Sequence, residues 1–78
     1  MNLFDGEKNC IYKVKNICLE LAVKRRLEIL GMTENVDVLI VNKKSSAIII
    51  KVRGTRFALG KKFAQGIEVG GVLNWWNR

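Results

Sequence analysis

Apolar residues recur at helical spacing in one stretch of the first half of the chain. The members of this pattern are Leu19, Val23, Leu27 and Leu30. Intervals of four, four and three positions place these side chains on one face of an α-helix. Gly31 comes next and can adopt a left-handed conformation, which ends a helix and lets Met32 pack back against it. The pattern therefore predicts a helix that stops at Gly31, and Asn16 is the residue that we expect to cap its start.

Alternating apolar and polar positions predict short strands on both sides of this helix. The expected strands cover residues 10–15, 36–41, 47–52, 56–59 and 67–69. The polar link at residues 43–46 predicts a hairpin whose loop is longer than the tightest turns. A short helical turn is expected at residues 61–64, before Gly66, and we expect Gly70 and Gly71 to loosen the chain after the last strand. The aromatic side chains of Tyr12, Phe57 and Phe63 are expected to face the core.

One helix after the first strand, followed by four short strands, predicts a small closed sheet. Closure is favourable here because open sheet edges on a short chain invite aggregation. We expect one mainly β domain over residues 1–71 and a C-terminal tail over residues 72–78. Trp75 and Trp76 lie in this tail, where they would either anchor a partner or membrane interface or pack over an opening of the barrel.

The positive charge of the chain is unevenly distributed. The net charge is +7 over 78 residues, and no acidic residue occurs between Val38 and Ile67. The basic residues of that segment are Lys43, Lys44, Lys51, Arg53, Arg56, Lys61 and Lys62. Such a segment suits nucleic acid, acidic lipid or an acidic protein surface, and it is equally consistent with a solvated basic face. The candidate partner-binding residues are Arg25, Arg26, Arg53 and Arg56.

The residue types argue against catalysis and against a resident metal. The chain has no histidine, the commonest general base and metal ligand, and the spacing of Cys10 and Cys18 fits no zinc template. Because no nucleophile–base pair, phosphate loop or metal cluster is recognisable, we expect a protein without catalytic residues, cofactor or metal site. The N-terminus lacks an apolar signal region, and no apolar run reaches the roughly 20 residues of a membrane span, so we expect a cytoplasmic protein with reduced cysteines.

The order of these segments resembles the FeoA family, the ferrous iron transport protein A. The resemblance rests on residues 12–14 with Ile17, and on residues 26–32, 36–38, 48–52, 57–60 and 64–69. It implies a small SH3-like five-stranded β-barrel with one α-helix inserted after the first strand. It also implies an accessory or regulatory protein of ferrous iron uptake that binds FeoB, a membrane transporter with a GTP-binding domain, and performs no chemistry. The sequence departs from the family at residues 33–35, where Pro-Gly is common, and in the loop at residues 43–46, which lacks the usual glycine and acidic residues.

Two other interpretations remain open at this point. The basic segment would also suit a nucleic-acid-binding SH3-like module, although clear aromatic interleaving, which single-strand binders use for stacking, is missing. The second is self-association, in which the partner is another copy of this chain. The same module forms the C-terminal domain of iron-dependent repressors, but this sequence shows no DNA-binding helix-turn-helix, which favours the transport interpretation.

Overall fold

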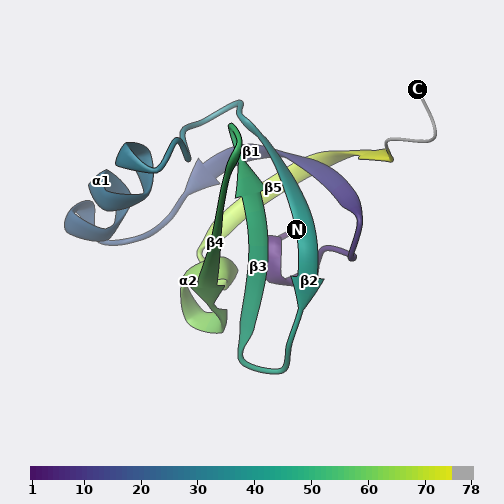
Figure 1. The fold of residues 1–78 in the computed structure, drawn as a ribbon. Coiled ribbons are helices and arrows are strands. Elements are labelled where there is room, and N and C mark those ends of the chain that lie inside the picture. The colour runs from purple at the N-terminus through teal and green to yellow at the C-terminus, as the bar shows by residue number, and fades with distance from the viewer. Residues whose placement is uncertain (75–78) are drawn as a thin grey trace.

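The computed structural model describes residues 1–74 as a five-stranded antiparallel sheet with a helix after the first strand (Figure 1). The elements are the 3-10 turn η1 (Leu3–Asp5), β1 (Cys10–Ile17), α1 (Leu21–Ile29), β2 (Asp37–Lys43), β3 (Ala47–Val52), β4 (Thr55–Gly60), α2 (Lys61–Gln65) and β5 (Ile67–Asn74). The strands lie in the order β4-β3-β2-β1-β5. The predicted mainly β architecture is therefore confirmed. Among residues 1–74, no helix has the length and apolar character that crossing a membrane would require.

The sheet curls around one apolar core, and α2 carries the chain between its two outer strands, β4 and β5 (Figure 1). The prediction that the sheet closes completely is wrong for residues 1–74, because β4 and β5 do not pair with each other. Strand β3 shows how the pattern builds the core, because Ile48, Ile50 and Val52 are fully buried while Lys51 is exposed. Full burial of such an aliphatic side chain contributes about 1.5–3 kcal/mol. Tyr12 joins this core, as predicted, whereas Phe57 is only partly buried.

Two hairpins connect β2 to β3 and β3 to β4. The β2–β3 link spans residues 44–46, and the N–H of Lys44 donates to the carbonyl of Ala47 at 2.8 Å. The link is longer than two residues, as predicted. Strands β3 and β4 are joined by only Arg53 and Gly54, with φ angles of 50° and 83°. Positive φ at both positions defines a type I′ turn, whose twist matches that of the flanking strands.

The end of α1 is the one that the sequence predicts. Gly31 has a φ of 99°, and its N–H donates to the carbonyl of Glu28 at 3.0 Å. The N–H of Met32 donates to the carbonyl of Leu27 at 2.9 Å, which completes a Schellman motif. Met32 is fully buried. Gly31 thus both stops the helix and turns the chain back into the core.

The predicted start of α1 is wrong. Asn16 lies within β1, where it pairs with Glu68 of β5, and its Oδ1 accepts the N–H of Ile17 at 2.9 Å. Because the ladder with β5 continues to Ile17, the backbone is extended beyond the expected cap. The helix begins only at Leu21, after Glu20, whose side chain makes no capping hydrogen bond.

The last strand is longer than predicted. Strand β5 pairs with β1 from Ile67 through Asn74, with a register shift opposite Tyr12. Gly71 lies at this shift with a φ of 66°, so it accommodates a β-bulge in a continuing strand instead of loosening the chain. Trp75 and Trp76 lie outside the described residues.

Candidate functional site

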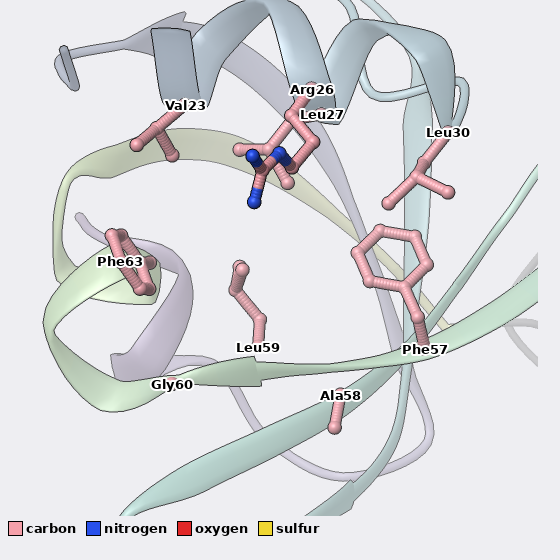
Figure 2. A pocket seen from close by; sticks show the side chains of 9 residues that line it. All are labelled: Val23, Arg26, Leu27, Leu30, Phe57, Ala58, Leu59, Gly60 and Phe63. Carbon is pink, nitrogen blue, oxygen red and sulfur yellow. The ribbon is translucent and has the colours of Figure 1, made fainter.

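A pocket of about 250 Å³ lies between α1 and the β4–α2 corner of the barrel (Figure 2). Its walls come from Val23, Arg26, Leu27 and Leu30 of α1 and its C-cap, from Phe57 and Leu59 of β4, and from Phe63 of α2. Figure 2 shows the helix above and β4 below, with the side chains of Phe57 and Leu59 directed toward the helix. The lining is mostly apolar, and Arg26 is its one charged member.

The pocket exists because the apolar face of α1 extends past the core. Val23, Leu27 and Leu30 share one helical face, but of the three only Leu27 is buried, and Leu30 remains 36% exposed. Strand β4 brings Phe57 and Leu59 to the same space, because alternate residues of a strand share a face. The predicted helical face is therefore confirmed for Val23, Leu27 and Leu30, but it is wrong for Leu19, which precedes α1. The face forms a wall of the pocket as well as part of the core.

Phe63 is not a core residue, contrary to the sequence prediction, and its side chain is 45% exposed. The reason lies in the short helix α2, where Ala64 is fully buried against the core. Neighbouring residues of a helix point about 100° apart, so Phe63 is turned from the core to the side of the pocket. An exposed aromatic ring next to an apolar pocket is typical of a binding surface.

Arg26 supplies the charge of the pocket. Figure 2 shows its side chain reaching from α1 into the space above Leu59. The ion pair that the structure contains within residues 1–74 joins Lys13 and Asp37, with 3.5 Å between Nζ and Oδ1. The guanidinium of Arg26 therefore has no carboxylate partner in this part of the chain, and it is oriented toward the solvent-accessible pocket.

The four arginines predicted as contact residues do not converge on one point. Arg26 lines the pocket, while Arg25 is exposed on the same helix outside the lining. Arg53 forms part of the β3–β4 turn. Arg56 is exposed on β4 and lies directly opposite Lys51 of β3, a juxtaposition of like charges that costs stability. Their role in partner binding stays a prediction.

Two lysines of the basic segment form a separate cluster. The Nζ atoms of Lys43 and Lys61 lie 5.0 and 5.4 Å from the centroid of the Phe4 ring. Lys43 also donates to the carbonyl of Gly6 at 3.2 Å. The basic residues of the segment thus fall into two groups, one beside Phe4 near the β2–β3 link and one on β4 and the turn before it.

Tyr12 and the two cysteines do not line the pocket. The hydroxyl of the buried Tyr12 accepts the N–H of Glu7 at 2.8 Å, and burial raises the pKa of Tyr12 above its usual value. Cys10 is partly buried and Cys18 is exposed, and both are free thiols. Among residues 1–74 no three His, Cys, Asp or Glu side chains gather as a metal site would require. The pocket is therefore the feature of this structure that is best suited to binding.

Comparisons with known proteins agree with this fold. The family model described as the FeoA domain matches residues 1–70. A solved iron uptake regulatory protein (FeoA) is 27% identical, with a TM-score of 0.84 over 94% of this chain and 97% of its own. The zinc-complexed FeoA of Stenotrophomonas maltophilia is 28% identical, with a TM-score of 0.77 over 90% of this chain and 89% of its own; it is described as a procaryotic SH3 domain protein.

A third solved protein shows the same fold at lower identity. FeoA of Chlorobium tepidum is 24% identical, with a TM-score of 0.83 over 88% of this chain and 68% of its own. A comparison with curated protein sequences finds no match. The family match and the shared architecture lead to one conclusion: this chain belongs to the FeoA family and has its SH3-like, mainly β fold.

Proposed function

We propose that this protein is an accessory protein of ferrous iron uptake that acts by binding the transporter FeoB at its cytoplasmic face. Membership of the FeoA family supports a role in ferrous iron transport. A role as a ferrous iron transport activating factor has been suggested for the Stenotrophomonas maltophilia relative. The protein acts as a binding and regulatory module, without chemistry of its own.

The pocket between α1 and β4 is the observation that carries the binding role. Small-molecule sites usually enclose about 300–1,000 Å³. This pocket, at about 250 Å³, is better matched to one or two side chains of a protein partner. Leu30 and Phe63 present apolar surface beside it, and Arg26 adds a cation. Aromatic and arginine side chains are the types that dominate binding energy in protein interfaces.

Arginines in and beyond the pocket suit an acidic partner surface. Arg26 lines the pocket, whereas Arg56 lies on the face of β4 opposite to Phe57 and Leu59. We expect Arg26 to make the charged contact in the pocket, and Arg25, Arg53 and Arg56 stay candidates for contacts outside it. Charge complementarity of this kind raises the association rate and selects the partner more than it raises affinity.

Binding to purified FeoB in lipid nanodiscs tests the proposal. Leu30→Ser removes apolar surface from the pocket, and burial of a leucine is worth enough that affinity should fall about tenfold or more. Ile29→Ser is the matched control, because Ile29 adjoins Leu30 in sequence, is 85% exposed and does not line the pocket. The control should bind like the wild type.

Both variants change an exposed residue, so thermal unfolding should show that they keep the fold. Equal loss of affinity in both variants would contradict a specific role for the pocket. No binding by the wild type would contradict the proposed function itself.

A further inference from the structure

Strand β4 is an outer strand of the sheet. It pairs with β3 on one side, and no strand of residues 1–74 pairs with its other side. Its last residue, Gly60, is also the N-cap of α2, so the carbonyl of Gly60 is used by the first turn of that helix. An outer strand presents a row of N–H and C=O groups that another extended chain can pair with.

The β3–β4 turn identifies the outward-facing groups. Val52 and Thr55 flank a two-residue turn, so they form a hydrogen-bonded pair, and the two kinds of pair alternate along the ladder from there. The residues of β4 at the other positions are Arg56, Ala58 and Gly60. Their N–H and C=O groups therefore point away from β3.

These outward-facing groups border the pocket. Ala58 and Gly60 both belong to its lining. Figure 2 shows the side chain of Ala58 directed away from the pocket, and Gly60 has no side chain, so both residues reach it through their backbone. An extended segment beside β4 would satisfy these groups and would present every second side chain to the pocket.

The side chains of β4 specify the chemistry of such a segment. Residues opposite Phe57 and Leu59 would face α1, where the partly exposed Leu30 favours apolar partners. Residues opposite Arg56 would lie on the outer face, beside the like-charged pair of Arg56 and Lys51. An acidic side chain there would relieve that repulsion.

We propose that the free edge of β4 takes up an extended partner segment, in which apolar residues alternate with acidic ones, as an added strand. The identity of the partner rests on the function proposed above, whereas the mode of binding follows from β4 itself. The segment pairs with the backbone of Arg56 and Ala58 and with the N–H of Gly60, inserts apolar side chains below α1 and places a carboxylate beside Arg56.

A peptide-display selection on the full chain tests this mode without the transporter. Peptides are selected from a random library on the wild type, and their affinity is then measured for the wild type and for Ala58→Pro. The proline removes the outward N–H of residue 58, and the sheet should tolerate this because that N–H makes no bond to β3. Ala58→Pro loses the hydrogen bond from this N–H to the peptide and keeps the peptide from approaching β4 closely. Binding should therefore weaken about tenfold or more. Ala58→Thr keeps the N–H and controls for a changed side chain at the same position, so it should bind clearly more tightly than Ala58→Pro. Hydrogen exchange should show that the peptides protect the amides of Ala58 and Gly60.

The possible outcomes separate this inference from the proposed function. Alternating acidic and apolar peptides that require the amide of Ala58 support an added strand. Failure to select any binder, or binders that tolerate Ala58→Pro in a folded protein, overturns it. A dimer in sedimentation that Ala58→Pro dissociates assigns the edge to a second copy and also overturns it. If the peptides bind as expected but FeoB does not bind the wild type, only the proposed partner is wrong.

Discussion

The side chain of Arg53 lies against Gly31. A Cβ atom added to Gly31 would stand 3.2 Å from Cδ of Arg53, and 3.6 Å from its Cβ and Cγ. The end of α1 therefore rests on the β3–β4 turn, and both residues have positive φ angles. Arg53 consequently has a packing role beside any role in binding, and a substitution at this position changes more than charge.

Substitutions of Gly31 should be destabilising. Gly31→Val forces a β-branched residue into a left-handed conformation and crowds Arg53, so we expect a loss of about 1–3 kcal/mol in the free energy of unfolding. Gly54→Ala is the comparison, because Gly54 also has a positive φ but a Cβ added there would have nothing within 4 Å. It should lose about 1–2 kcal/mol from conformation alone. Urea unfolding measures both, and an unchanged stability of Gly31→Val would show that Gly31 is not the helix stop.

The buried hydroxyl of Tyr12 should make the fold sensitive to alkali. Burial raises the pKa of Tyr12 above 10.0, so the folded state holds its proton at a pH where the unfolded state has lost it. The stability that this contributes is complete below pH 10 and falls as the pH rises through the raised pKa of the folded state.

Tyr12→Phe isolates this effect from the titration of the lysines. It should lose about 1 kcal/mol at neutral pH, because the N–H of Glu7 loses its acceptor, and should fall less steeply than the wild type above pH 10. Urea unfolding over this pH range gives both quantities. Parallel curves for the two proteins would exclude Tyr12 as the source.

The start of α1 leaves room for stabilisation. Glu20 occupies the N-cap position with φ −55° and ψ 147°, yet its side chain makes no capping bond. Glu20→Asp keeps the charge and supplies a side chain of the right length, so we expect a gain of about 0.5–1 kcal/mol. Glu20→Ala should give no gain. Thermal unfolding measures both variants. A rise in melting temperature for Glu20→Asp that is no larger than for Glu20→Ala would show that the start of α1 does not limit stability.

Nucleic-acid binding should be weak. Among the residues whose side chains the structure describes, Phe63 is the one exposed aromatic, whereas single-strand binders use several stacking side chains. Fluorescence anisotropy with mixed DNA and RNA should show binding that disappears near physiological ionic strength, as expected for contacts through Lys and Arg alone. A micromolar or tighter complex at that salt concentration would favour the nucleic-acid interpretation.

Local signals predicted the parts of the fold that depend on few residues. Gly31 and Met32 ended α1 as expected because the cap is built from adjacent residues. The start of α1 was not predictable from Asn16, because pairing with β5, distant in sequence, extends β1 to Ile17. Gly71 was misinterpreted for the same reason, since the bulge that needs it depends on β1.

The candidate site was only partly predictable. The helical face and the arginines were visible in the sequence, but the pocket arises from the position of α1 relative to β4. The sequence pattern predicts an inward position for Phe63, whereas Ala64 is the residue of α2 that the packing buries. No local pattern distinguishes these neighbours, since the orientation of so short a helix is fixed by the barrel around it.

Uptake of ferrous iron under anaerobic conditions decides whether the pocket between α1 and β4 serves transport. A strain lacking this gene should take up less iron, and the wild-type gene and Ile29→Ser should restore uptake. Leu30→Ser, made at equal abundance, should restore it poorly, because it alters the lining of the pocket. Normal uptake in the deletion strain, or full restoration by Leu30→Ser, would contradict this role.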